Sequence, residues 1–176
     1  MHIGNTFWFT GLSGAGKTTL SKSLADVLKK EGKPVVILDG DELRSTVSKD
    51  LGFTEEDRLE QNRRAANIAK VLNLQGIHVM AALISPTHNI QSTIQQIIGT
   101  EHCFLIHLDC SLECCKKRDV KQLYQNISTT AVNNFTGIHQ PYESPIHPWL
   151  KIDTENVSLE QCQIELLEAI RGTFNQ

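Results

Sequence analysis

The segment from Gly11 to Thr18 constrains the fold of this chain more than any other stretch. It reads Gly-Leu-Ser-Gly-Ala-Gly-Lys-Thr, a complete G-x-x-x-x-G-K-[ST] motif, and it stands between the apolar run 7–9 and the amphipathic stretch 17–30. A glycine-rich loop between a strand and a helix turns its backbone N–H groups toward a phosphate, and the helix N-terminus adds the positive end of its dipole. The motif therefore predicts a phosphate-binding loop for a nucleoside triphosphate.

The last side chains of this loop carry the chemistry that a triphosphate needs. We expect Lys17 to neutralise oxygens of the β- and γ-phosphates, and the Thr18 hydroxyl to ligate Mg²⁺. The predicted ATP-binding residues of the loop are Gly11, Leu12, Ser13, Gly14, Ala15, Gly16, Lys17, Thr18 and Thr19. The alternative is a glycine-rich turn with a chance Lys-Thr pair, and the flanking strand and helix patterns count against it.

Short apolar runs alternate with longer helical patterns along the chain. The runs with strand character are 7–9, 35–38, 77–84, 103–108 and 150–152. Helices are expected over 17–30, from the Thr54 cap to Gly76, and after Ser158, with a buried face of Leu159, Cys162, Leu166 and Ile170. Such alternation predicts an α/β chain, and with the phosphate-binding loop we expect the P-loop NTPase fold of the nucleoside-monophosphate-kinase type. Its parallel five-stranded sheet would have helices on both faces and ligands at the carboxyl ends of the strands.

Length and composition narrow the class further. The 176 residues fit a single domain, 1–176, and a formal charge of −3 gives no general attraction to nucleic acid. No apolar run approaches the ~20 residues that span a bilayer, and the first residues lack a signal-peptide pattern. The five cysteines have no paired spacings, so we expect reduced thiols in a cytoplasmic protein without a membrane partner. The stretch from about 119 to 148 lacks clear periodicity and is the expected lid or substrate loop.

A phosphate-binding loop alone does not separate kinases from GTPases and motor ATPases. The guanine-reading N-K-x-D motif is absent and the chain is too short for a motor, which leaves small-molecule kinases. The acceptor would then meet ATP at the segments 39–44 and 51–58. Their carboxylates can take a hydroxyl proton, their arginines can grip an anion, and Phe53 can stack on a base. Taken singly, Asp39 could instead cap a helix, Arg58 could pair with Glu55, and Phe53 could belong to the core.

These segments resemble the motifs of the adenylyl-sulfate kinases (APS kinases) nearly from end to end of the chain. The matching motifs are Gly-Leu-Ser-Gly-Ala-Gly-Lys-Thr-Thr at 11–19, Asp-Gly-Asp-x-x-Arg at 39–44, Leu-Gly-Phe at 51–53, Asp-Arg at 57–58, Arg-Arg at 63–64, Ile-Ser-Pro at 84–86, Arg-Asp-x-Lys-x-Leu-Tyr at 118–124, Phe-Thr-Gly-Ile at 135–138 and Pro-Tyr-Glu-x-Pro at 141–145. The resemblance implies that ATP and adenylyl sulfate give ADP and 3′-phosphoadenylyl sulfate, a step of sulfate assimilation. It also implies Mg²⁺ as cofactor and suggests a homodimer.

The resemblance assigns roles on the acceptor side of the site. Phe53 and Phe135 would sandwich the adenine of adenylyl sulfate, and Arg44 and Arg58 would hold its phosphosulfate group. The backbone of Ile84, Ser85 and Pro86 would line the same pocket.

Further matched residues would lie near the transferring phosphoryl group. Asp41 would lie near the ribose 3′-hydroxyl as the base, Lys121 would sit on a mobile lid, and Arg118 would lie close to the adenine of ATP. Ser85 matches a serine often described as phosphorylated in the family, so it joins Lys17, Asp41 and Lys121 as a candidate catalytic residue. In-line transfer between two bound nucleotides needs positioning and charge neutralisation, so we do not expect an obligatory phosphoserine.

The chain departs from the family pattern around the acceptor and the lid. Gln61, which we include among the acceptor-binding residues, stands where the family usually has asparagine. Thr87 and His88 replace an aromatic residue and an arginine, Gln122 replaces a glycine, and the segment 128–134 also differs. Two alternatives therefore stay open. One is the same transfer to another nucleotide-linked acceptor, such as cytidine diphosphoramidate, and the other is a catalytically silent nucleotide-binding module.

Overall fold

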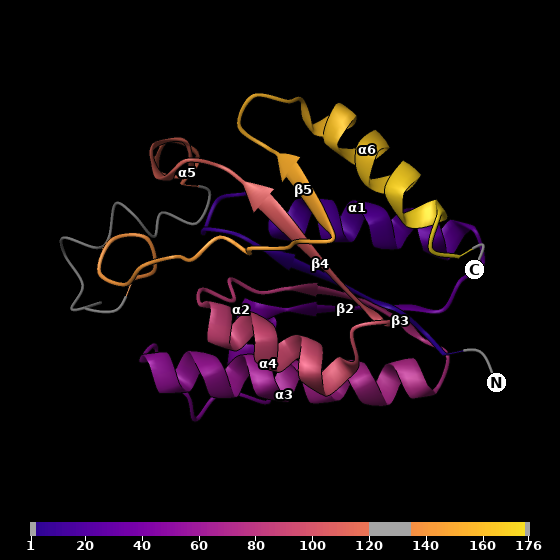
Figure 1. The fold of residues 1–176 in the computed structure, drawn as a ribbon, viewed down its shortest axis with the longest axis horizontal. Helices are drawn as coiled ribbons and strands as arrows, with labels where there is room; N and C mark the ends of the chain where they lie inside the picture. Colours follow the sequence, from indigo (N-terminus) through magenta and orange to yellow (C-terminus); the bar gives the residue numbers. More distant parts are fainter. Residues whose placement is uncertain (1–2, 120–134, 175–176) are drawn as a thin grey trace.

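The computed structural model describes residues 3–119 and 135–174, in which strands are separated by helices around one sheet (Figure 1). The elements are β1 (Thr6–Thr10), α1 (Lys17–Lys30), β2 (Val35–Asp39), α2 (Gly40–Ser45), α3 (Glu55–Leu74), β3 (His78–Ala82), α4 (His88–Ile98), β4 (Cys103–Asp109), α5 (Leu112–Arg118), β5 (Leu150–Asp153) and α6 (Leu159–Arg171). All strand pairs are parallel, and the order is β2-β3-β1-β4-β5. The predicted fold class is confirmed.

The sheet is covered on both faces because its central strand carries large apolar side chains in alternation. Phe7 and Phe9 of β1 point into the cluster formed with α1 and α6, whereas Trp8 points into the cluster formed with α3 and α4. All three are fully buried. Side chains alternate between the faces of a strand, so a continuous apolar run requires a helix layer on each side. Figure 1 shows those two layers.

The helix starts are set by local capping residues. The Thr54 hydroxyl accepts a hydrogen bond from the Asp57 backbone N–H, and the Asp57 carboxylate accepts one from the Thr54 N–H, which makes a reciprocal capping box for α3. The Ser158 hydroxyl caps α6 by accepting from the Gln161 N–H. The burial predicted for Leu159 is wrong: its side chain is 51% exposed, because it lies in the first turn of α6 at the rim of the site.

Parallel strands bring their carboxyl ends to one edge of the sheet, and the loops at that edge form the site. Loops follow β1, β3, β4 and β5 at residues 11–16, 83–87, 110–111 and 154–158, and β2 leads directly into α2. The described part of the expected lid segment, 135–148, contains an isolated bridge between Thr136 and Gln140 and lies over the same edge. Within the described residues, no helix combines the length and apolarity needed to cross a membrane.

Candidate active site

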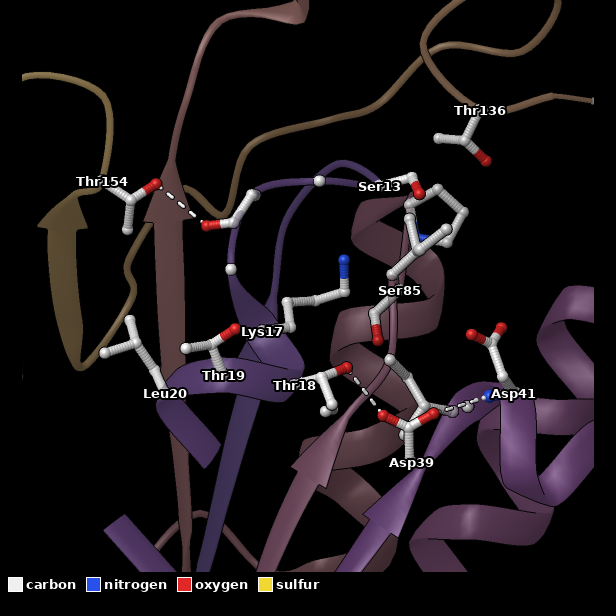
Figure 2. Close-up of a pocket in the computed structure, with 18 of the residues that line it drawn as sticks. Ser13, Lys17, Thr18, Thr19, Leu20, Asp39, Asp41, Ser85, Thr136 and Thr154 are labelled. Atoms are coloured by element: carbon white, nitrogen blue, oxygen red, sulfur yellow. Dashed lines mark hydrogen bonds between the residues drawn. The ribbon is translucent and has the colours of Figure 1, made fainter. Parts of the chain in front are cut away.

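One continuous cavity of about 660 Å³ lies at the carboxyl edge of the sheet. The glycine-rich loop and the start of α1 form one end, and the segments around β2, α3 and β3 form the other (Figure 2). Phe135 and Thr136, at the start of the 135–148 segment, also line it. A cavity with a phosphate loop at one end and a second binding region at the other can hold two substrates at once.

The glycine-rich loop adopts the conformation that a phosphate cradle needs. Gly14 and Gly16 have φ angles of 86° and 100°, in the left-handed region, and Gly16 is the N-cap of α1. A Cβ on Gly14 would lie 3.0 Å from the backbone oxygen of Cys115, so the loop packs tightly on α5. The Lys17 ammonium donates hydrogen bonds to the backbone oxygens of Gly11 (2.9 Å) and Leu12 (2.8 Å). The cation is therefore held across the mouth of the loop.

Asp39 joins the phosphate loop to the acceptor side. The Thr18 hydroxyl donates to one oxygen of the Asp39 carboxylate (2.8 Å), and the other oxygen accepts from the Asp41 backbone N–H (3.0 Å), as Figure 2 shows. The second contact also caps α2, so the capping role open to Asp39 from the sequence is confirmed. A hydroxyl and a carboxylate oxygen at this distance form a donor set of the kind Mg²⁺ prefers.

Two arginines surround the ring of Phe53. The guanidinium carbons of Arg44 and Arg58 lie 4.4 and 5.7 Å from the ring centroid, and Phe53 is 50% exposed, so its predicted alternative as a core residue is wrong. Arg58 also donates to the backbone oxygen of Phe53 (3.2 Å) and to the Gln140 side chain (3.0 Å). Burial, and then the charge of Arg44, lower the pKa of Arg58 to about 10. Two neighbouring cations with a partly exposed ring suit an anionic ligand that carries a base.

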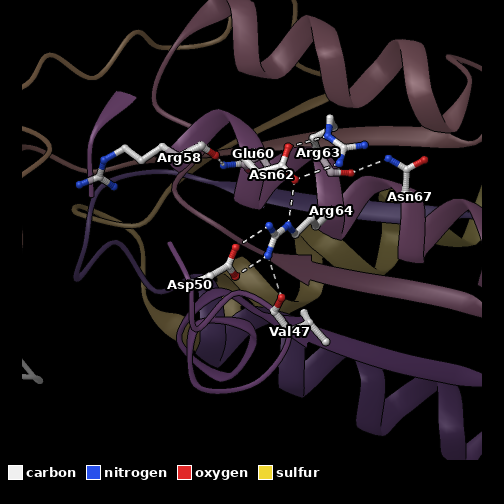
Figure 3. A network of polar contacts seen from close by, with 8 residues as sticks. All are labelled: Val47, Asp50, Arg58, Glu60, Asn62, Arg63, Arg64 and Asn67. Carbon is white, nitrogen blue, oxygen red and sulfur yellow. Dashed lines mark hydrogen bonds and ion pairs between the residues drawn. The ribbon is translucent and has the colours of Figure 1, made fainter. Parts of the chain in front are cut away.

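Arg64 fastens the loop that precedes Phe53 onto α3. Its guanidinium contacts both oxygens of Asp50 (2.6 and 2.7 Å), the backbone oxygen of Val47 (2.9 Å) and the carboxylate of Glu60 (2.8 Å), as Figure 3 shows. A bidentate arginine–carboxylate pair fixes geometry better than a single contact. The loop therefore keeps a set position relative to the helix that carries the acceptor-side arginine.

The chain after β3 is held by buried hydrogen bonds. Ser85 has a φ of 48°, is fully buried, accepts a hydrogen bond from the Trp8 indole N–H (2.8 Å) and donates one to the Asn62 amide oxygen (2.8 Å). The Asn62 amide nitrogen donates in turn to the Arg58 backbone oxygen (2.8 Å). The Ser85 hydroxyl is thus engaged between β1 and α3.

Comparisons with known proteins give the family. The family model described as Adenylylsulphate kinase matches residues 3–153. The adenylyl-sulfate kinase of Bacteroides thetaiotaomicron is 44% identical over 163 residues, which cover 93% of this chain and 81% of that protein. The chain belongs to the adenylyl-sulfate kinase family. The adenylyl-sulfate kinase of Acaryochloris marina is 39% identical over 170 residues, covering 97% of this chain and 83% of that protein.

A similar solved structure agrees with this family. The APS kinase of Mycobacterium tuberculosis, in complex with AMPPNP and APS, superposes with a TM-score of 0.91 at 32% identity. The match covers 97% of this chain and 99% of that one. Members of the family are kinases that use ATP.

The cavity gathers most of the residues that the sequence predicts for the two substrates. Those that line it on the ATP side are Ser13, Gly14, Ala15, Gly16, Lys17, Thr18, Thr19 and Arg118. Those that line it on the acceptor side are Asp41, Arg44, Phe53, Arg58, Gln61, Ile84, Ser85, Pro86 and Phe135. Gly11 and Leu12 are not among the lining residues, and their carbonyls accept hydrogen bonds from Lys17. Lys121 lies outside the described residues. The roles of all these residues stay predictions.

Several residues of the ATP end were missed by the sequence motifs. Thr154, which follows β5, donates from its hydroxyl to the backbone oxygen of Ala15 (2.9 Å), and Arg118 donates to the backbone oxygens of Gly14 (3.5 Å) and Thr154. Further apolar residues of this end are Val157, Leu159 and Cys162. The rule that ligands lie beyond the carboxyl ends of parallel strands would have pointed to the residues after β5.

The departures from the family pattern fall on different kinds of position. Gln61 lines the cavity, and its amide nitrogen donates to the backbone oxygen of Gly40 (2.8 Å). Thr87 instead caps α4 through the Ile90 N–H. His88 forms a hydrogen bond with the backbone oxygen of Ser144 (2.9 Å). The first departure bears on ligand contacts, and the other two hold local structure.

Replacing Ser85 with alanine should leave substantial turnover and should lower stability. The change removes the hydrogen-bond partner of the Trp8 N–H and of the Asn62 amide oxygen. Leaving a buried polar group without a partner costs about 1–3 kcal/mol. The checks are steady-state kcat and the free energy of unfolding in urea. Ser85→Cys is the matched control, since it keeps a weak donor at the same place. Trapping a phosphoserine that passes its phosphoryl group to the acceptor at the steady-state rate would contradict direct transfer.

Proposed function

We propose that this chain transfers the γ-phosphoryl group of ATP to the 3′-hydroxyl of adenylyl sulfate, giving ADP and 3′-phosphoadenylyl sulfate. The observation that carries this function is the single cavity that runs from the phosphate loop to the ring of Phe53 between Arg44 and Arg58. Family membership, and a similar structure described in complex with both AMPPNP and APS, support the same pair of substrates.

The phosphate loop and Lys17 hold the phosphates of ATP. The loop N–H groups and the start of α1 supply hydrogen bonds and a positive dipole end for the β-phosphate. The Lys17 ammonium lies across the phosphate loop, where it donates hydrogen bonds to the backbone oxygens of Gly11 and Leu12. When ATP binds, it donates to phosphate oxygens instead, at the position where negative charge develops during transfer. The adenine of ATP lies toward Arg118 and the residues that follow β5.

The acceptor occupies the other end of the cavity. Its phosphosulfate group lies against Arg44 and Arg58. Burial lowers the pKa of both guanidiniums, and a bound anion stabilises their charged form. Its base lies against Phe53 and Phe135, which both line the cavity. This arrangement directs the ribose of the acceptor toward the phosphate loop.

Asp41 is the base that takes the proton of the 3′-hydroxyl. It is exposed at the start of α2, and its backbone is fixed by the hydrogen bond to Asp39. Asp39 and Thr18 would hold Mg²⁺, since their oxygens face each other at the phosphate loop. When bound, Mg²⁺ supplies positive charge that neutralises the β- and γ-phosphates.

Adenylyl sulfate should have a higher kcat/KM than cytidine diphosphoramidate in the wild-type enzyme, and Gln61→Asn should widen the difference. Stacking is worth roughly 1–3 kcal/mol per base but barely distinguishes bases, so selectivity depends on polar contacts to the base edge. The Gly40 carbonyl can only accept, so the Gln61 amide nitrogen faces it and the amide oxygen is left to meet an exocyclic amine. Adenine and cytosine both carry such an amine, and the extra methylene of glutamine lets the amide reach the smaller ring of cytosine. The shorter asparagine would lose this reach, so selectivity for adenine should increase.

The measurement is a coupled assay of ADP formation with each acceptor. Gln96→Asn on the exposed face of α4 is the matched control and should change neither constant. A higher kcat/KM for the cytidine compound in the wild type would contradict the proposed acceptor, and turnover with neither compound would contradict kinase activity.

Two further properties concern the compartment in which the enzyme acts and its oligomeric state. All five cysteines are free thiols, which supports the cytoplasm as the compartment in which the enzyme acts. The homodimer suggested by the sequence stays a prediction. A similar structure, 29% identical with a TM-score of 0.71, is described as a hexameric APS kinase from Thiobacillus denitrificans, and this chain covers 29% of it.

A further inference from the structure

Two thiols and a carboxylate meet behind the phosphate loop, outside the cavity. The ligand atoms of Cys110, Cys114 and Glu155 all lie within 4.8 Å of one another. They come from the end of β4, from α5 and from the loop after β5, so the fold brings together segments far apart in sequence. Cys110 is buried, Cys114 is partly buried and Glu155 is exposed, which leaves the cluster open to solvent on one side.

The carboxylate is already fixed beside the thiols. One oxygen of Glu155 accepts a hydrogen bond from the Ser111 backbone N–H (2.7 Å). The loop around it is ordered by Asp153, which accepts hydrogen bonds from the backbone N–H groups of Glu155 (3.0 Å) and Asn156 (2.9 Å). The ligand atoms therefore meet without rearrangement of the backbone.

The chemistry of these groups suits a thiophilic cation. Tetrahedral zinc has Zn–S bonds of about 2.3 Å and Zn–O bonds of about 2.0–2.2 Å, which places two sulfur ligands about 3.8 Å apart. Atoms within 4.8 Å of one another reach that geometry with small side-chain movements. Two thiolates and a carboxylate around a divalent cation leave one negative charge, and Arg118 lies near enough to all three groups to offset it. The buried Cys115 thiol, which contacts Cys110, or water can complete the coordination.

We propose that Cys110, Cys114 and Glu155 form a binding site for a thiophilic divalent cation of the Zn²⁺ class. This site is separate from the oxygen donors Thr18 and Asp39, since sulfur ligands select such cations over Mg²⁺. A bound cation ties α5 to the loop after β5. The same two segments contact the phosphate loop through Arg118 and Thr154, so the cation braces the ATP end of the site.

The test uses the full chain, reduced, treated with a chelator and free of nucleotide. Calorimetric titration with Zn²⁺ should give one equivalent bound and a rise in the midpoint of thermal unfolding. Titration with Co²⁺ should give a thiolate-to-metal charge-transfer band. Removing a group that only hydrogen-bonds to a metal ligand costs about 10–100-fold in metal affinity, and removing a ligand itself should cost no less. Cys114→Ser and Glu155→Gln should therefore each weaken Zn²⁺ binding at least tenfold. Glu155→Gln keeps an oxygen for the Ser111 N–H, so it preserves the local fold.

Two matched controls should bind Zn²⁺ as the wild type does. Cys103→Ser removes a thiol at the start of β4, where burial raises the pKa to about 12. Glu113→Gln removes an exposed carboxylate from the first turn of α5. Binding that survives Cys114→Ser, or a Co²⁺ complex without the charge-transfer band, would place the cation elsewhere and overturn the proposal. A reduced protein that binds no Zn²⁺ would overturn it too, and a disulfide found by mass spectrometry between Cys110 and Cys114 would then identify a redox pair.

Discussion

We expect Lys17→Ala to remove phosphoryl transfer and to leave the fold intact. Loss of a preorganised group that stabilises developing charge costs about 10²–10³-fold in kcat, and Lys17 is the side chain held across the phosphate loop. The cost to the fold should be small, since the hydrogen bonds from Lys17 to the backbone oxygens of Gly11 and Leu12 are each worth about 1 kcal/mol net. The measurements are kcat in a coupled assay and the midpoint of thermal unfolding.

Lys30→Ala is the matched control for this experiment. Lys30 lies in the last turn of α1, exposed and remote from the cavity, so its loss should leave kcat unchanged. If Lys17→Ala retained more than about a tenth of the wild-type rate, the side chain could not supply the several kcal/mol expected of it, and its assignment would be wrong.

We expect Asp41→Asn to lower kcat by about 10²–10⁴-fold, the usual range for loss of a general base, and to change the affinity for ATP little. The structure separates the two neighbouring carboxylates. Both oxygens of Asp39 are engaged, by the Thr18 hydroxyl and the Asp41 N–H, whereas the Asp41 side chain is exposed at the start of α2. Asp39→Asn should therefore weaken binding of ATP with Mg²⁺, and Asp41→Asn should act on the transition state.

Single-turnover kinetics and equilibrium binding of an ATP analogue distinguish these two effects. Glu42→Gln, one residue further along α2 and exposed, is the control for removal of a negative charge near the site. If Asp41→Asn weakened ATP binding as much as it slowed turnover, Asp41 would belong to the metal shell and the base would have to be another group.

The sheet and the phosphate loop could be predicted because their signals are local. Five apolar runs gave five strands, and Gly11 to Thr18 carries its own strand and helix on either side. The short helices α2 and α5, of six and seven residues, are harder to predict because each contains too few turns to show a period. The strand β3 is fully buried, and it ends at Ala82, two residues before the predicted boundary.

The candidate site was predicted where residues follow a motif and missed where contacts are long-range. The sequence does not tell which of the two carboxylates, Asp39 or Asp41, contacts Thr18. The structure decides it, because α2 begins at Gly40 and leaves Asp39 at its N-cap, beside Thr18. Thr154 contacts Ala15 across 139 residues, a relation that no local pattern records. Leu159 followed the apolar stripe of α6, yet it is exposed because the stripe runs past the core to the edge of the cavity.

The carboxylate of Asp39 has a thermodynamic consequence for how the two substrates bind. One of its oxygens meets Thr18 at the phosphate loop, and the other fixes the first turn of the helix that carries Asp41 and Arg44. If ATP and its metal ion draw the Thr18 hydroxyl away from Asp39, the hydrogen bond between Asp39 and the Asp41 N–H on the acceptor side changes too. Linkage requires any such effect to be reciprocal, so whatever factor ATP applies to the affinity for adenylyl sulfate, adenylyl sulfate applies to the affinity for ATP.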